Sequence, residues 1–164
     1  MKLVNVKKTP LEVGPALAAA RAATEPLFVP ATVFADDRGW SIMNQFQGVL
    51  TPEGQVNYSL MYPNVIKAWH RHKLQADLWI CVRGHIKVGI HRDSDNTTWS
   101  IVIGEKNAGI LIIPETLWHG GATVSQDNAG LLYYVTRAYD PKNADEERRA
   151  FDGIEGFPWG VVHK

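Results

Sequence analysis

The sequence predicts an all-β protein of one domain, built as a sandwich or a barrel. Helical periodicity ends near residue 33, and short apolar or alternating runs follow, separated by Gly, Pro, Asn and Asp. About eight such runs with short connections are typical of sandwiches and barrels. The length of 164 residues suits a single domain, which buries roughly two thirds of its unfolded surface and can hold a real core.

Residues 1–33 are expected to form an N-terminal arm with a short helix, and residues 34–164 the single β-domain. The stretch PALAAARAAT (15–24) is rich in alanine and begins with a proline, which is favourable in the first turn of a helix. Further prolines at positions 26 and 30 predict that an extended arm follows this helix.

The strand predictions follow from hydrophobic patterning after residue 33. The run at 85–91 alternates strictly, which places three branched apolar side chains on one face and His85 and His91 on an expected solvent face. The runs GILIIP and LLYYV are continuous, as in strands buried on both faces. The predicted strands are WSIMNQF (40–46), VNYSLMY (56–62), VIKAWH (65–70), DLWICV (77–82), HIKVGIH (85–91), TWSIVIG (98–104), GILIIP (109–114) and AGLLYYVTRAY (129–139).

A short C-terminal helix is predicted over residues 143–151. The stretch NADEERRAF lacks the strand pattern, and Asn143 is a suitable N-cap because its side chain can accept a hydrogen bond from a free backbone N–H.

Composition excludes several classes of function. Lys plus Arg and Asp plus Glu both number 17, so the net charge is zero, which argues against nucleic-acid binding and against a polybasic membrane-surface protein. No apolar run approaches the roughly 18 residues of a membrane span, and MKLVNVKKTP lacks a secretory apolar region. The single cysteine, Cys81, excludes an intrachain disulfide and a CxxC site, so we expect a cytoplasmic protein.

Three histidines and one aspartate have the spacing of a metal or catalytic site. His70 and His72 alternate in a predicted strand and therefore share a face, Asp77 follows, and His119 lies five residues after a proline. Three imidazoles and a carboxylate are suitable ligands for Fe, Mn, Ni or Zn. This spacing resembles the two short motifs of the cupin superfamily, which implies a double-stranded β-helix jelly roll. In metal-binding cupins these positions ligate the ion.

A second resemblance covers residues 34–159. Seven fragments resemble motifs of the dTDP-4-dehydrorhamnose 3,5-epimerase family in the same order. They are FADDRGW (34–40), QVNYS (55–59), VIKAWH (65–70), QADLWICVRGHIKVGI (75–90), IPETLWHGG (113–121), DNAGLLYYVTRAYDP (127–141) and FDGIEGFPW (151–159).

The resemblance implies roles for individual residues. The family's catalytic base corresponds to His70, whose imidazole titrates near neutral pH, and its acid to Tyr133, a phenol with a pKa of about 10. The family forms a homodimer that exchanges an N-terminal strand and presents an Arg to the neighbouring site. The positions that contact the nucleotide sugar correspond to Arg38, Gln55, Asn57, Lys67 and His119.

Three departures from the family pattern concern the chemistry. Asp77 stands where the family has a Lys beside the enolate oxygen, and Lys67 or Lys73 is a candidate for the lost cation. No Asp stands among residues 160–164, so we expect that the family's Asp after the W-P segment is not matched. His72 is an additional histidine, and the string His70-Arg71-His72-Lys73 resembles nucleotide-sugar 3,4-ketoisomerases, so His72 and Lys73 are further candidate substrate contacts.

The leading expectation is therefore a homodimeric jelly-roll enzyme that epimerises C3 and/or C5 of a nucleotide-linked 4-keto-6-deoxy sugar without a cofactor. It is expected to bind neither nucleic acid nor a membrane. Three alternatives remain open: a 3,4-ketoisomerase using His70 and His72, a cupin enzyme with a divalent metal at His70, His72, Asp77 and His119, and a non-catalytic sugar-binding cupin.

Overall fold

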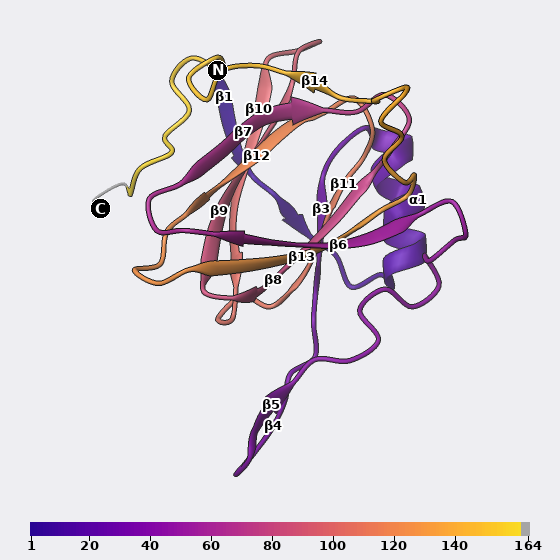
Figure 1. Cartoon of the computed structure of the whole chain (residues 1–164), viewed down its shortest axis with the longest axis vertical. Coiled ribbons are helices and arrows are strands. Elements are labelled where there is room, and N and C mark those ends of the chain that lie inside the picture. The colour runs from indigo at the N-terminus through magenta and orange to yellow at the C-terminus, as the bar shows by residue number, and fades with distance from the viewer. Residues whose placement is uncertain (162–164) are drawn as a thin grey trace.

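The computed structural model describes residues 1–161, which form two six-stranded β-sheets, a two-stranded hairpin and one helix (Figure 1). The first sheet has the strand order β1 (Lys2–Asn5), β10 (Thr97–Gly104), β9 (His85–Arg92), β12 (Trp118–Thr123), β7 (Ile66–Arg71) and β14 (Glu147–Arg148). The second has the order β2 (Lys7–Lys8), β3 (Leu27–Pro30), β11 (Gly109–Ile113), β8 (Asp77–Arg83), β13 (Ala129–Val135) and β6 (Gln55–Met61).

The chain crosses repeatedly between the two sheets. From β6 to β9, and again from β10 to β13, each strand lies in the sheet opposite to that of the strand before it. This double winding produces the jelly roll that the sequence predicts. Within residues 1–161, no helix has the length and apolar character needed to span a membrane.

The main core fills the space between the sheets. Ile86, Val88 and Ile90 are fully buried there, as the alternation of β9 predicts. A second cluster lies between the outer face of the second sheet and helix α1 (Val13–Ala23). Because β8 and β11 contribute to both clusters, they are buried on both faces, which accounts for their continuous apolar sequences.

Helix α1 begins at Val13, two residues before the predicted start. Pro15 is tolerated because the first backbone N–H groups of a helix have no intrahelical acceptor. Residues 27–30, expected as part of an extended arm, form β3 in the second sheet, and residues 2–8 add an edge strand to each sheet.

Aromatic side chains cover the outer face of the first sheet. Trp69 of β7 contacts Phe157 and Trp159 with ring centroids 5.1 and 4.8 Å apart, so the C-terminal segment lies across this face. His91, which the alternation places in solvent, is buried on the same sheet and bonds to Thr98. The expectation of a solvent-facing His91 is therefore wrong, because the C-terminal segment shields this face of the sheet.

One predicted strand is mostly wrong, and one strand of the structure was not predicted. Of the run 40–46, only Trp40 and Ser41 are extended; they belong to β5 (Gly39–Ser41), which pairs with β4 (Phe34–Asp36) in a hairpin that projects from the body (Figure 1). Strand β12 was not predicted because two glycines interrupt its pattern. A Cβ at Gly120 would lie 2.4 Å from the Cβ of Ala68, so this glycine permits close pairing with β7.

The predicted C-terminal helix over residues 143–151 is wrong. The chain there forms turns and the short strand β14, which pairs with β7. Glu147 contacts Arg71 and Lys73 at 2.6 and 2.7 Å, and the Asp145 carboxylate accepts backbone N–H groups that follow β7. An isolated helix of this length is marginal in water, so these tertiary partners determine the conformation.

Candidate functional site

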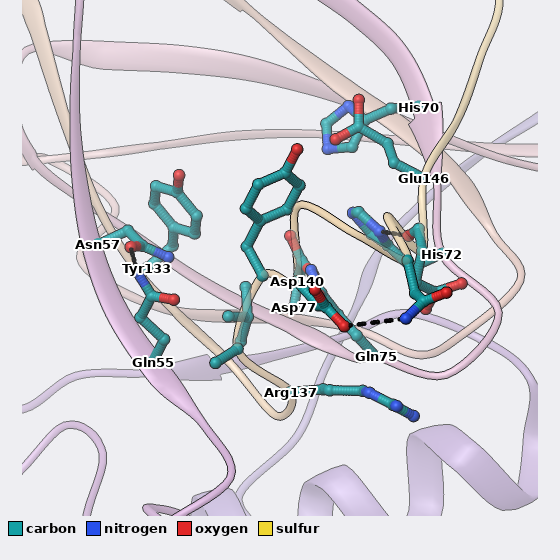
Figure 2. A pocket seen from close by; sticks show the side chains of 15 residues that line it. Gln55, Asn57, His70, His72, Gln75, Asp77, Tyr133, Arg137, Asp140 and Glu146 are labelled. Atoms are coloured by element: carbon teal, nitrogen blue, oxygen red, sulfur yellow. Dashed lines mark hydrogen bonds between the residues drawn. The ribbon is translucent and has the colours of Figure 1, made fainter.

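A cleft of about 350 Å³ opens between β7 of the first sheet and strands β6, β8 and β13 of the second (Figure 2). Residues after β13, from Arg137 to Glu146, complete its wall. The candidate base and the candidate acid lie on opposite sides of the cleft. Figure 2 shows Tyr133 beside Gln55 and Asn57 on one side, and His70 with His72 on the other.

Strand pairing brings the three candidate histidines together. His70 of β7 and His119 of β12 are direct partners across the ladder, and their ring centroids lie 4.2 Å apart. His72 follows the end of β7, with its ring 5.4 Å from that of His70 and 5.8 Å from that of His119. Asp77 approaches from β8, and one donor atom from each of the four residues lies within 4.8 Å of all the others.

Backbone carbonyls fix the orientation of two of these rings. His119 Nδ1 bonds to the carbonyl of Leu117 at 2.9 Å, and His72 Nδ1 bonds to the carbonyl of Asp145. A carbonyl only accepts, so each Nδ1 carries the proton and a neutral ring keeps its lone pair on Nε2. His119 Nε2 lies 3.5 Å from Asp77 Oδ2, is buried and has no hydrogen-bond partner among residues 1–161.

Asp77 carries a negative charge at the floor of the cleft. Its carboxylate is 2% exposed and accepts hydrogen bonds from Gln75 Nε2 at 2.8 Å and Trp79 Nε1 at 3.0 Å. Burial acts to raise the pKa of this carboxyl, but interactions with His119, His72 and Gln75 outweigh burial and hold the pKa below its usual range. The carboxyl is therefore ionised at neutral pH.

The pKa shifts of His70 and Tyr133 leave the imidazole unprotonated and the phenol protonated, which are the starting states that a base and an acid require. Burial, with a further contribution from His119, lowers the pKa of His70 against the opposing effect of Asp77, so its imidazole is neutral. Burial also raises the pKa of Tyr133, followed by the charges of Asp77 and Glu146, so its phenol stays protonated. The cleft thus offers a proton acceptor and a proton donor from opposing sheets.

The two predicted amides also lie in the cleft. Gln55 and Asn57 share a face of β6, and Gln55 Nε2 donates to Asn57 Oδ1 at 2.7 Å. Asn57 pairs in register with Tyr133 of β13. These side chains offer neutral hydrogen-bond donors and acceptors to a polar ligand.

The three predicted cations do not line this cleft. Lys67 donates to Ser59 at 2.8 Å, further along the face of β6 that carries Gln55 and Asn57. Lys73 pairs with Glu147 at 2.7 Å. Arg38 pairs with Asp36 in the projecting β4–β5 hairpin, away from the histidine cluster (Figure 1).

The segment after β13 supplies site residues that sequence reasoning missed. It brings Arg137, Asp140, Asp145 and Glu146 to the cleft, roughly 70 positions after β7 in the chain. With Asp77 these residues make the lining acidic, and within the described part of the chain Arg137 is the one lysine or arginine among the lining residues. The acidic run after residue 139 was the available signal, and the helix prediction obscured it.

Comparisons with known proteins agree with this architecture. The model of the dTDP-4-dehydrorhamnose 3,5-epimerase family matches residues 22–162. The spore coat polysaccharide biosynthesis protein SpsL of Bacillus subtilis is 34% identical over 135 residues, which cover 77% of this chain and 89% of SpsL. The probable low-salt glycan biosynthesis epimerase Agl13 of Haloferax volcanii is 39% identical over 101 residues, 58% of this chain, and the chain spans just under two thirds (65%) of Agl13.

Solved structures share the fold at lower identity. A dTDP sugar isomerase from Desulfovibrio desulfuricans superposes with a TM-score of 0.73 at 20% identity, covering 84% of this chain and 92% of that one. The RmlC epimerase of Mycobacterium tuberculosis gives a TM-score of 0.67 at 23% identity, covering 82% and 74%. These likenesses confirm the jelly-roll fold.

Proposed function

Since the chain belongs to the dTDP-4-dehydrorhamnose 3,5-epimerase family, we propose that it epimerises C3 and/or C5 of a nucleotide-linked 4-keto-6-deoxy sugar. The observation that carries this proposal is the placement of a neutral imidazole, His70, and a protonated phenol, Tyr133, on opposite sides of one cleft. The buried, unpaired Cys81 is compatible with the expected reducing cytoplasm.

The proposed reaction moves one proton on each face of the sugar ring. The His70 imidazole removes the C–H proton beside the ketone, and the electron pair shifts to the ketone oxygen as an enolate. Tyr133 then delivers its proton to the same carbon from the opposite face, which inverts the centre. Solvent reprotonates the phenolate and takes the proton from His70, so the cycle needs no redox partner.

Stabilisation of the enolate is the step for which the family's Lys is missing. The Asp77 carboxylate at that position repels an enolate, so a donor or cation must come from elsewhere in the cleft. Arg137 lines the cleft and is our candidate from this chain for that role.

Solvent deuterium incorporation tests the proposal. The wild type, incubated in D₂O with a dTDP-linked 4-keto-6-deoxy sugar, is expected to place deuterium at C3, C5 or both. His70→Asn is expected to lower the exchange rate by about 10²–10⁴-fold, and Tyr133→Phe is expected to lower the rate of inversion at the exchanged carbon by a similar factor. Tyr58→Phe is the matched control, because Tyr58 lies exposed on β6 outside the cleft lining and its variant should exchange normally.

Two results would overturn this function. One is an absence of both deuterium exchange and nucleotide-sugar binding in the wild type. The other is movement of the ketone from C4 to C3 in the product, which identifies a 3,4-ketoisomerase using His70 and His72. An unchanged exchange rate in His70→Asn would show that His70 is not the base.

A second candidate is a metal-dependent enzyme, favoured by the geometry of the four-residue cluster. His119 Nε2 and Asp77 Oδ2 face each other at 3.5 Å without a hydrogen bond, which suits a shared cation. Three imidazoles and one carboxylate fit a divalent first-row ion, held by His70, His72, Asp77 and His119. Such an ion, when bound, would polarise a substrate carbonyl as a Lewis acid, and His70 would then be a ligand.

Metal analysis distinguishes the two candidates. Stoichiometric Fe, Mn, Ni or Zn in protein purified without chelators, with loss of the metal in His119→Ala, supports the metal site. His91→Gln serves as the control, since His91 is a buried histidine that bonds to Thr98 outside the cluster. A metal-free protein that also takes up none of these ions in a calorimetric titration excludes this candidate.

The partner proposed for the chain is a second copy of itself. The β4–β5 hairpin projects from the body and exposes Phe34 and Trp40, which are 53% and 45% exposed (Figure 1). In a homodimer this hairpin would cover its apolar side chains against the partner and present Arg38 to the partner's cleft.

A further inference from the structure

His72 and Asp145 meet although they lie 73 residues apart in the sequence. His72 follows β7 and is 8% exposed, whereas Asp145 lies two residues before β14. The His72 ring bonds through Nδ1 to the backbone carbonyl of Asp145. The orientation of one cluster histidine therefore depends on the C-terminal segment.

The side chain of Asp145 makes a second attachment to the same place. Its carboxylate accepts the backbone N–H of Lys73 at 3.0 Å and that of Leu74 at 2.7 Å. These two residues directly follow His72, so Asp145 holds both the ring and the backbone turn that carries it. Hydrogen bonds to an ionised acceptor are about twice as strong as neutral ones.

The contact determines which nitrogen of His72 is available. Because the Asp145 carbonyl only accepts, Nδ1 is the protonated nitrogen and the lone pair of the neutral ring lies on Nε2. His119 has the same arrangement through the carbonyl of Leu117. Two rings of the cluster are thus held with Nε2 free to accept a proton or bind a cation.

Glu147, two residues after Asp145, binds the same end of β7 through contacts of its own. Glu147 pairs with Arg71 across the β14–β7 ladder and forms ion pairs with Arg71 and Lys73. Asp145 and Glu147 therefore both bind the β7 end, while Glu146 between them lines the cleft.

We propose that Asp145 is a positioning residue of the site, which holds the His72 ring in its Nδ1-protonated form through a carbonyl that its own carboxylate anchors to the turn after β7. The inference does not depend on the proposed epimerase function, since an oriented Nε2 serves proton transfer, sugar binding or metal binding equally.

Nitrogen NMR of the histidine rings tests this role directly. In ¹⁵N-labelled wild type at pH 8, where an ordinary imidazole is neutral, His72 is expected to show a protonated Nδ1 and an unprotonated Nε2. In Asp145→Ala the anchor is lost, and the His72 signals are expected to move to those of a mixture of the two tautomers. His72→Gln identifies the signals.

Two variants of the same segment serve as matched controls. Asp140→Ala removes another cleft-lining carboxylate, whose hydrogen bonds within residues 1–161 stay in its own turn, to Lys142 and Asn143. Glu147→Ala weakens the attachment of β14 but leaves both Asp145 contacts in place. Neither control should change the His72 tautomer.

An unchanged tautomer in folded Asp145→Ala overturns the proposal, as does an equal change in either control. If thermal unfolding shows that Asp145→Ala does not fold, Asp145→Asn replaces it. The Asn side chain keeps one oxygen that can accept a backbone N–H, but its NH₂ group faces the second N–H and cannot accept it. A partial shift of the His72 signals in this variant supports the role, and no shift refutes it.

Discussion

Asp77 determines the electrostatic character of the cleft, because its buried carboxylate is ionised beside three imidazoles. Two hydrogen bonds, from Gln75 and Trp79, offset part of the cost of burying this charge. The remaining lone pairs face His119 and the cleft. The floor of the cleft therefore favours a positively charged or proton-donating group, and it disfavours an enolate that has no cation or hydrogen-bond donor beside it.

His91 gives the molecule a pH-dependent stability outside the cluster. Burial lowers the pKa of His91, with Asp93 acting in the opposite direction. Its folded pKa thus lies below its unfolded value of about 6.5, so the unfolded state binds more protons and stability falls as pH decreases below about 6.5. We predict that His91→Gln loses less thermal stability than the wild type between pH 7 and pH 5.

The measurement is the melting temperature at steps of pH. His70, whose pKa is also lowered by burial, contributes to the same transition, so the comparison is between slopes and not between absolute values. Parallel curves for the two proteins would show that His91 titrates alike in the folded and unfolded states.

At the scale of elements, β9 packs against the aromatic layer so closely that position 89 has no room for a side chain. A Cβ on Gly89 would lie 2.5 Å from Trp69 and 2.6 Å from Phe157. We predict that Gly89→Ala lowers the free energy of unfolding by about 1–3 kcal/mol, because rigid rings must move. Urea denaturation measures the change.

Gly14→Ala is the control for this prediction. Gly14 lies in α1, where the nearest atom to an added Cβ is Gly48 O at 3.6 Å. Alanine there should be neutral or stabilise by up to about 1 kcal/mol, owing to its helix propensity. Equal losses in both variants would remove the packing explanation.

At the scale of the whole molecule, the projecting hairpin stands out because all residues from 32 to 41 are exposed in a single copy. If it forms the proposed homodimer contact, truncating an aromatic anchor should cost about 2 kcal/mol, or about 30-fold in dissociation constant. We predict this loss for Trp40→Ser, measured by sedimentation velocity over a range of concentrations.

Leu50→Ser is a suitable comparison, since Leu50 is 59% exposed outside the hairpin and its variant should keep the wild-type association. A monomeric wild type, or an unchanged association in Trp40→Ser, would contradict the hairpin contact.

The sequence alone determined seven strands of the β-domain, β6 to β11 and β13, and the residues that form the cluster. Alternation in β9 identified Ile86, Val88 and Ile90 as core, and the continuous run 109–114 identified a strand buried on both faces. His70, His72, Asp77 and His119 were named from spacing, and the structure brings them together. Such features depend on local patterning or on short motifs, so they can be predicted without knowledge of the packing.

Only the tertiary structure decided what surrounds that cluster. The segment at 143–151 pairs with β7 because Asp145 and Glu147 find partners on it, and no periodicity in the sequence encodes those partners. The tertiary structure also buries His91, pairs Lys73 with Glu147, and places Arg38 in the projecting hairpin. It brings Arg137 and Glu146 to the cleft. Contacts between segments roughly 70 residues apart in the sequence form only when the sheets bring the segments together. Their contribution to stability therefore cannot be inferred from either segment alone.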